Sequence, residues 1–145
     1  MRPVLDTTVV VSGLTWNGPP RRLLDLAASG DIALFSGTVQ LEELAGVLER
    51  RKFAAPLASR SLTATFLTQR YGAVTTSVFT AGADRAVPTD ADDDHVIAAA
   101  VRANADAVAT GDGHLLALDP YRRIRILRPA RVLELLNAAE AASDA

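Results

Sequence analysis

The apolar positions of the chain fall into short stretches of two kinds. Compact apolar runs such as IALFS at 32–36 predict buried strands, and apolar residues three or four positions apart, such as Leu41, Leu44 and Leu48, predict helices. The strands are predicted at 4–6, 32–36, 73–78, 106–110 and 123–127, and the helices at 18–30, 38–53, 61–72, 92–105, 113–118 and 130–142, with a helical turn directly after residue 6. Strands that alternate with helices indicate an α/β fold, in which helices cover both faces of a parallel sheet.

The chain has the size and punctuation of one domain. Its 145 residues leave room for a single domain over 1–145, and prolines and glycines separate short elements instead of forming a linker. The helix 18–30 illustrates this, because its prolines suit a first helical turn and Gly30 suits the position after a helix. We expect the last four residues, ASDA, to be frayed.

Composition narrows the setting of the protein. No apolar stretch is long enough for a transmembrane helix, and the N-terminus lacks the apolar segment and cleavage site of a secretory signal, so we expect neither membrane association nor processing. The chain contains no cysteine, which excludes disulfides and cysteine-based metal or nucleophile chemistry. These features are compatible with a cytoplasmic protein, which is our expectation.

The distribution of charge leaves nucleic-acid binding open. A formal net charge of −2 is unfavourable for binding phosphates. The charges are uneven, however: acids gather at 90 and 92–94, arginines gather at 122, 123, 125, 128 and 131, and Arg50, Arg51 and Lys52 form a second basic group. Overall acidity therefore does not exclude RNA, because acids concentrated at one site can account for it.

Several acids are predicted at one edge of the sheet. Asp6 closes the first strand, Asp112 follows the strand 106–110 by two residues, and the aspartates at 92–94 open the helix that leads into that strand. Ligands of parallel α/β sheets bind outside the carboxyl ends of the strands. The acids are therefore predicted where such a fold holds its ligand.

The helix 38–53 adds a further candidate. Its apolar stripe leaves Glu43 at the border of the core and Glu42 facing solvent, so Glu43 is the acid that can reach a cleft. The same projection does not choose between Asp93 and Asp94, because each shares a helix face with apolar residues.

Carboxylates that converge without histidine or cysteine favour a hard cation. Oxygen ligands suit Mg²⁺ or Mn²⁺, and such an ion activates water and stabilises charge on a phosphoryl oxygen. Hydrolysis of a phosphodiester is the reaction that suits this set best. Each acid also has a simpler interpretation: Asp6 and the aspartates at 90–94 as helix caps, Asp112 as a turn former, and Glu43 as an ordinary flank residue. Their joint placement at one edge of the sheet favours a shared site.

Three segments resemble the motifs of PIN-domain proteins. VLDTTVVVSGL resembles the opening strand with its aspartate, LEELAGVLERRKF the second motif, and TDADDDHVIAAAVRANADAVATGDGHLLAL the third and fourth. The resemblance implies a three-layer α/β/α domain with a central parallel sheet. It also implies four catalytic and metal-binding residues around Mg²⁺ or Mn²⁺: Asp6, Glu43, Asp94 and Asp112. Asp6 and Asp94 would be direct ligands, and the other two would complete the site or hold metal-bound waters.

The same resemblance implies a function. Many bacterial PIN-domain proteins are VapC-like toxin ribonucleases, often dimeric, paired with a small antitoxin that blocks the cleft. We therefore expect a metal-dependent endoribonuclease with an RNA substrate, a cognate antitoxin and a homodimeric assembly. Two positions depart from the family pattern, because Thr8 stands where asparagine is common and Gly113 where a basic residue is frequent. A threonine hydroxyl still forms local hydrogen bonds, so we expect Thr8 to alter the support of the site rather than abolish it.

Two other functions remain open. The first is a catalytically silent PIN-fold module that binds RNA or a protein partner. The second is a phosphohydrolase with Asp6 as its nucleophile, which is disfavoured because such enzymes tend to carry a second aspartate two residues on, where this chain has Thr8. In the nuclease, candidates to hold the RNA backbone are Arg21, Arg22, Arg50, Arg51 and the C-terminal arginines.

Overall fold

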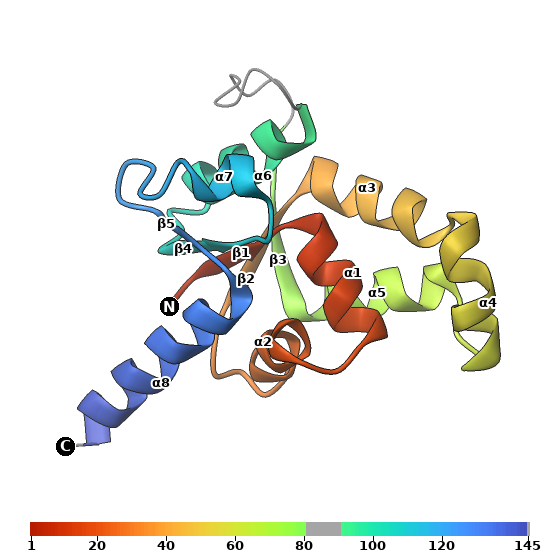
Figure 1. Cartoon of the computed structure of the whole chain (residues 1–145), viewed down its shortest axis with the longest axis horizontal. Helices are drawn as coiled ribbons and strands as arrows, with labels where there is room; N and C mark the ends of the chain where they lie inside the picture. Colours follow the sequence, from red (N-terminus) through yellow and green to blue (C-terminus); the bar gives the residue numbers. More distant parts are fainter. Residues whose placement is uncertain (81–90, 145) are drawn as a thin grey trace.

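A parallel sheet with the strand order β3-β2-β1-β4-β5 forms the centre of the computed structural model, which describes residues 1–80 and 91–144 (Figure 1). The side chains of residues 51, 52, 54, 91–94, 143 and 144 lie outside this description. The strands are β1 (Pro3–Leu5), β2 (Leu34–Gly37), β3 (Thr75–Val78), β4 (Ala107–Ala109) and β5 (Arg125–Leu127). The helices are α1 (Thr7–Thr15), α2 (Pro19–Ala28), α3 (Thr38–Leu48), α4 (Arg51–Ser59), α5 (Ala64–Val74), α6 (Ala91–Arg102), α7 (Gly113–Leu116) and α8 (Pro129–Asp144).

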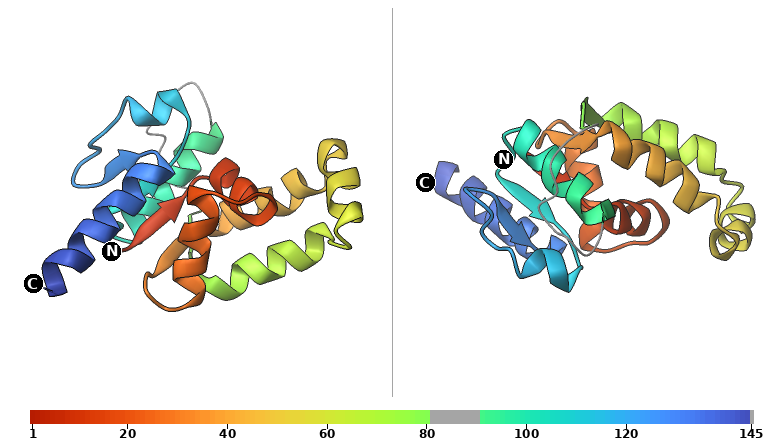
Figure 2. Two further views of the ribbon diagram at one scale, coloured as in Figure 1. Left: turned by 60° about the horizontal axis from the view of Figure 1, so that its bottom comes forward. Right: turned by 90° about the horizontal axis from the view of Figure 1, so that it is seen from above.

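Helices cover both faces of the sheet. Successive side chains of a strand point to opposite faces, so Val4 and Leu5 of β1 lie in different apolar cores. Leu5 packs with residues of α1, α2, α3, α5 and α8, whereas Val4 packs with residues of α6 and α7. Helix, sheet and helix therefore form three layers (Figure 2), which confirms the predicted α/β/α fold.

The winding of the chain changes direction at the middle of the sheet. From β1 the chain runs outward to β2 and β3, and it then returns to β4 on the other side of β1 before ending the sheet at β5. β1 and β4 are parallel neighbours, with Val4 opposite Val108 and Leu5 opposite Ala109. Such a reversal is a topological switch point, and α/β folds bind ligands just beyond the carboxyl ends of the two strands involved.

Most predicted elements are present, although several helix ends differ from the predicted ones. The predicted turn after residue 6 is a helix of nine residues, α1. α8 continues to Asp144, so the tail that we expected to be frayed is helical up to that residue. In Figures 1 and 2, α8 and α4 extend toward opposite ends of the molecule. None of the helices in the described residues has the length and apolar character needed to cross a membrane.

The single helix predicted over 38–53 is wrong, because the chain breaks between α3 and α4. Arg50 has an extended backbone (φ −63°, ψ 147°) between the two helices. The apolar pattern explains the break: a continuous helix would place Phe53 about 140° around the axis from Leu48. Restarting the helix lets Phe53 and Leu57 pack on the same core as Leu48.

Candidate active site

Asp6 lies at the carboxyl end of β1 and is buried, with 7% of its surface exposed. Its backbone N–H donates to the carbonyl of Ala109 in β4 at 3.0 Å, which ties the residue to the neighbouring strand. Asp6 precedes α1, yet its side chain makes no capping hydrogen bond. Helix capping therefore does not account for this aspartate, whose carboxylate lines a pocket of about 970 Å³.

A hydroxyl group joins Asp6 to Asp112. The buried Thr110 Oγ1 donates to Asp6 Oδ2 at 2.8 Å and accepts a hydrogen bond of 3.0 Å from the backbone N–H of Asp112. Thr8 donates to the same Asp6 oxygen at 3.3 Å, which is the local support that we expected from a threonine at this position. Two hydroxyls thus fix the orientation of the Asp6 carboxylate.

Thr110 was not among the residues predicted for the site. Its signal was a hydroxyl residue directly at the end of the strand that precedes Gly111 and Asp112. The residue is completely buried, and its backbone N–H donates to the carbonyl of Leu127 at 2.9 Å. Both the backbone and the side chain of Thr110 therefore hold the carboxyl edge of β4 in place.

Asp112 has two roles: a local structural role at the start of α7, and a place in the pocket of Asp6. Its Oδ1 accepts a hydrogen bond of 2.8 Å from the backbone N–H of His114, so the residue caps α7. It also lines the same pocket as Asp6, and its negative charge is one of the factors that raise the pKa of Asp6. The cap fixes where this second carboxylate stands.

Glu43 reaches the pocket from α3. The start of this helix is tied to β1 by the buried side chain of Gln40, which donates to the carbonyl of Leu5 at 3.2 Å and accepts from the backbone N–H of Gly37 at 3.0 Å. Glu43 follows Gln40 by three residues, about one turn later. It is half-buried and lines the pocket, whereas Glu42 is exposed, as the helical projection predicted.

Asp94 belongs to the first turn of α6, a helix that packs on β1 and β2. Its side chain lies outside the described residues, as do those of Asp92 and Asp93, and Asp90 lies outside them altogether. The choice of Asp94 over Asp93 therefore stays a prediction.

The environment of Asp6 disfavours its charged form. Burial raises the pKa of its carboxyl group above the ordinary value, and hydrogen bonds from Thr110 and Thr8 offset this only in part. None of the ion pairs in the described part of the chain involves Asp6. A buried carboxylate beside a second carboxylate, with neutral hydrogen-bond donors alone, gains most from a cation placed between the two.

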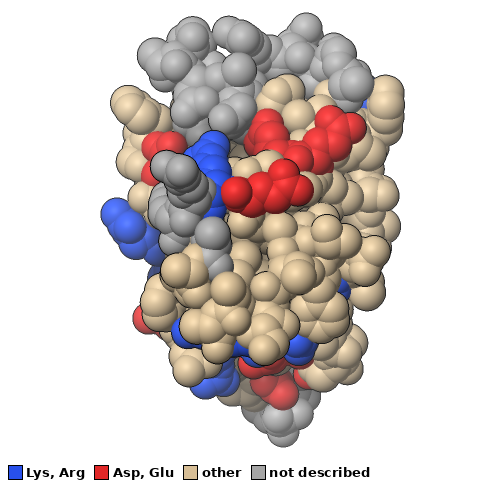
Figure 3. Space-filling model, turned by 90° about the vertical axis from the view of Figure 1, so that its right-hand side faces the viewer, with Lys and Arg blue, Asp and Glu red and all other residues tan. Residues whose placement is uncertain are grey.

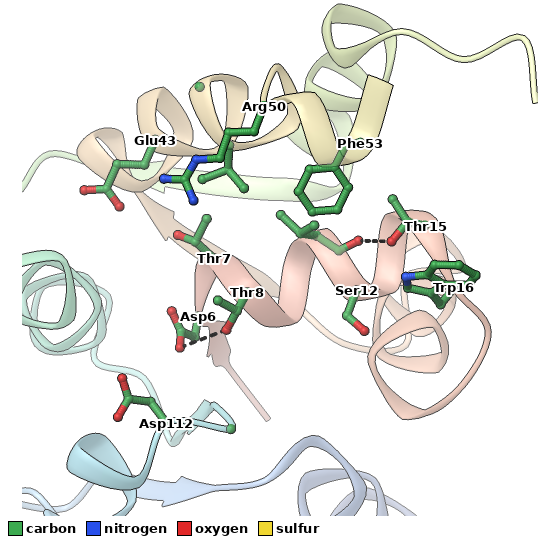
Figure 4. A pocket seen from close by; sticks show the side chains of 14 residues that line it. Asp6, Thr7, Thr8, Ser12, Thr15, Trp16, Glu43, Arg50, Phe53 and Asp112 are labelled. Atoms are coloured by element: carbon green, nitrogen blue, oxygen red, sulfur yellow. Dashed lines mark hydrogen bonds between the residues drawn. The ribbon is translucent and has the colours of Figure 1, made fainter. Parts of the chain in front are cut away.

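The donor set fits a hydrated hard cation. Asp6 and Asp112 lie on one wall of the pocket, and Glu43 lies on the opposite wall (Figure 4). Within residues 1–80 and 91–144, as far as side chains are described, no three acidic, histidine or cysteine side chains are close enough to hold a metal ion together. Mg²⁺ keeps several waters and takes one or two carboxylates directly, so two carboxylates on one wall and a third across the pocket suit it.

Positive charge borders the acids. Arg50 lines the pocket, and Nη1 of Arg128 lies 4.0 Å from the position that a Cβ atom would take on Gly111, another lining residue. In Figure 3, acidic side chains gather in one part of the surface, with Lys or Arg side chains beside them. Of the other candidates, Arg21 lines a different pocket, and the side chain of Arg51 lies outside the described residues.

Comparisons with known proteins agree with this architecture. The family model of the PIN domain matches residues 2–114, a span that includes all four predicted acids. A crystal structure of VapBC2 from Rickettsia felis, bound to a DNA fragment from their promoter, is similar in fold, with a TM-score of 0.55 and 14% sequence identity over 87% of this chain and 97% of that chain. No curated protein matches the sequence. The extent of the family match leads to one conclusion: the chain belongs to the PIN domain family.

Proposed function

We propose that this protein is a metal-dependent endoribonuclease. The observation that carries the proposal is the pocket at the switch point of the sheet, where Asp6 and Asp112 are joined through Thr110 and face Glu43. Membership of the PIN domain family, whose model spans all four predicted acids, supports a nuclease. Asp94 at the start of α6 is the fourth acid of the proposed set.

Each residue of the pocket has a defined task in this proposal. Asp6 and Asp94 would bind Mg²⁺ or Mn²⁺ directly, with Glu43 and Asp112 completing the site or holding metal-bound waters. The ion, when bound, supplies Lewis-acid activation of water and neutralises charge on the phosphate. Thr8 and Thr110 keep the Asp6 carboxylate in one orientation.

Phosphate groups of the substrate need positive partners near these acids. Arg50 lines the pocket, and Arg128 lies next to its rim at Gly111. Both guanidinium groups are suited to hold phosphate oxygens of the substrate near the acids.

We further propose that the nuclease acts as the toxin of a toxin–antitoxin pair. The similar solved structure is named as a VapBC2 complex with promoter DNA, and by analogy this chain would pair with a small antitoxin. A homodimeric toxin and a cytoplasmic site of action belong to the same analogy.

Cleavage of a mixed RNA pool tests the proposal. Wild type is incubated with and without Mn²⁺ or Mg²⁺, beside Asp6→Asn and Asp112→Asn, which keep side-chain shape and remove charge. We expect cleavage by wild type only with metal, and none by either variant. Asp25→Asn, an exposed carboxylate on α2 outside this pocket, serves as the matched control and should cleave as wild type does.

Two results would overturn the proposal. A folded wild type, verified by circular dichroism, that binds no Mn²⁺ at millimolar concentration would reduce the acids to caps and turn formers. Metal-independent cleavage that survives in both variants would assign the activity to other residues or to a contaminant.

A further inference from the structure

The pocket that holds the acids extends well beyond them. Toward α4 its walls become apolar and aromatic, as Figure 4 shows for Trp16 and Phe53. The residues that line this distal half are Val11, Ser12, Thr15, Trp16, Gly46, Val47, Arg50 and Phe53. Thr15, Trp16 and Phe53 also line an adjoining pocket of about 150 Å³, so the groove continues past them.

Trp16 is the most unusual member of this surface, because 58% of a large apolar side chain is exposed. It follows the last residue of α1, and its backbone N–H donates to the carbonyl of Ser12 at 2.8 Å. The guanidinium group of Arg60 lies over the indole ring, 5.2 Å from its centroid, and Arg60 is itself bonded to the carbonyl of Thr15. These contacts of Arg60 and of the Trp16 backbone fix the position of the indole ring.

Trp16 borders the pocket that holds the acids, whereas Arg60, which lies over the indole ring, does not border it. Arg60 lines the adjoining pocket but not the pocket of the acids, whereas Trp16 lines both. Phe53 projects from α4 toward α1, on the other side of the groove (Figure 4). Two aromatic side chains from different helices therefore border one space that is continuous with the carboxylates.

We propose that Trp16 and Phe53 form a stacking subsite for one unpaired nucleobase of the RNA substrate. This inference rests on the proposed nuclease function, because it assigns the distal half of the same pocket. Unpaired bases stack on aromatic rings and on arginine planes, whereas the bases of a duplex have no free face. Arg50, between the acids and Phe53, matches the phosphate that precedes such a base.

Charge favours a nucleotide over an apolar protein segment at this place. Arg50 and Arg60 border the aromatic side chains, and no acid other than those of the proposed catalytic set lines either pocket among the described residues. The length of α1 gives the spacing: its nine residues rise about 13 Å from the acids to Trp16. The stacked base therefore belongs to a nucleotide near the cleaved bond but not at it.

Trp16 is the only tryptophan of the chain, so its fluorescence reports directly on this subsite. The experiment uses the full-length Asp6→Asn protein, which prevents cleavage, and titrates it with short single-stranded oligoadenylate. We expect quenching that saturates with binding. An abasic oligonucleotide of equal charge and a duplex RNA should cause much less quenching even where they bind.

Substitutions of Trp16 test whether the fluorescence quenching reflects binding and cleavage of the substrate. Trp16→Ala should weaken binding of single-stranded RNA about tenfold and raise KM more than it lowers kcat, and Trp16→Phe should recover part of the loss because it keeps a ring. Phe66→Ala is the matched control, since this exposed aromatic residue lies on α5 outside both pockets and should behave as wild type.

The outcomes separate this inference from the proposed function. Quenching of the Asp6→Asn protein by single-stranded RNA, together with no cleavage by wild type, would support the stacking subsite and contradict the proposed nuclease function. Cleavage by wild type without quenching, together with unchanged affinity in Trp16→Ala, would overturn the subsite alone and leave the groove to an apolar segment of a protein partner.

Discussion

Asp6 is a buried carboxylate whose hydrogen-bond donors are neutral, namely the hydroxyl groups of Thr8 and Thr110 and the backbone N–H of Thr7. Burial raises its pKa in the folded protein above the value in the unfolded chain. The native state therefore binds this proton more strongly than the unfolded state does. Its contribution to stability is complete below the unfolded pKa and is lost as pH rises through the raised folded pKa.

Asp6→Asn should consequently stabilise the metal-free protein at neutral pH. We expect a gain of about 1 kcal/mol, because the amide accepts the same hydroxyl bonds without the burial of a charge. Thermal unfolding in EDTA measures this, and the advantage of the variant should grow as pH rises from mildly acidic values to neutrality. Asp25→Asn, which alters an exposed carboxylate, should show no such trend. A variant that is less stable than wild type at every pH would contradict the role of burial.

The residues at strand ends were predictable, and their connector was not. Asp6 and Asp112 were assigned to one edge because parallel strands align their carboxyl ends. Thr110 could not be assigned a role, since the partner of its hydroxyl lies 104 residues away. A hydroxyl side chain accepts or donates to whatever the fold brings near, so its partner depends on tertiary structure.

α3 shows how helical periodicity distinguishes two adjacent acids. Glu43 lines the pocket, whereas Glu42 is exposed on the same helix. Glu43→Gln should lower metal-dependent cleavage about 10- to 100-fold, the usual cost of removing a group that supports a bound metal. Glu42→Gln, with the same chemical change one position earlier, should cleave as wild type does. Equal losses in both variants would indicate an effect on the helix rather than on the pocket.

The break between α3 and α4 is the element that periodicity missed. A local pattern describes the face of one helix, and the stripe through Leu44 and Leu48 is correct. The pattern does not indicate where a helix must end so that the residues after it can pack on the same core. Leu57 is buried in the same core as Leu48, in the helix that restarts at Arg51 after the extended backbone of Arg50.

At the scale of the whole molecule, an acidic chain is proposed to bind a polyanion. The net charge of −2 gives no general attraction to RNA, so binding must depend on a few well-placed arginines. Arg50 and Arg128 are the described arginines at the pocket and its rim. The same fact explains why composition alone did not indicate a nucleic-acid ligand.

Salt dependence measures these two contacts. Replacing Arg50 or Arg128 with alanine in the Asp6→Asn protein should reduce the slope of log affinity for single-stranded RNA against log salt by about 0.7 each. Arg70→Ala, at an exposed position of α5 that lines neither pocket, is the control and should keep the wild-type slope. A reduction of equal size in all three variants would indicate a diffuse electrostatic effect instead of defined phosphate contacts.

The fold was predictable from the alternation of strands and helices, while the groove was not. Its aromatic wall combines Trp16, at the end of α1, with Phe53 of α4, and nothing in the local sequence connects them. The tertiary fold brings the two rings to one surface, beside the contacts that Arg60 makes with Thr15 and Trp16 at the end of α1.

The hydroxyl bond from Thr110 to Asp6 also has a consequence for the time at which the protein becomes active. The two residues are 104 positions apart, and ribosomes add about 5–20 residues per second, so the second half of the site is made about 5–20 s after the first. During that interval a nascent chain carries Asp6 without the strand that completes the site. The proposed nuclease site therefore stays incomplete until Thr110 and the strand before it have been translated.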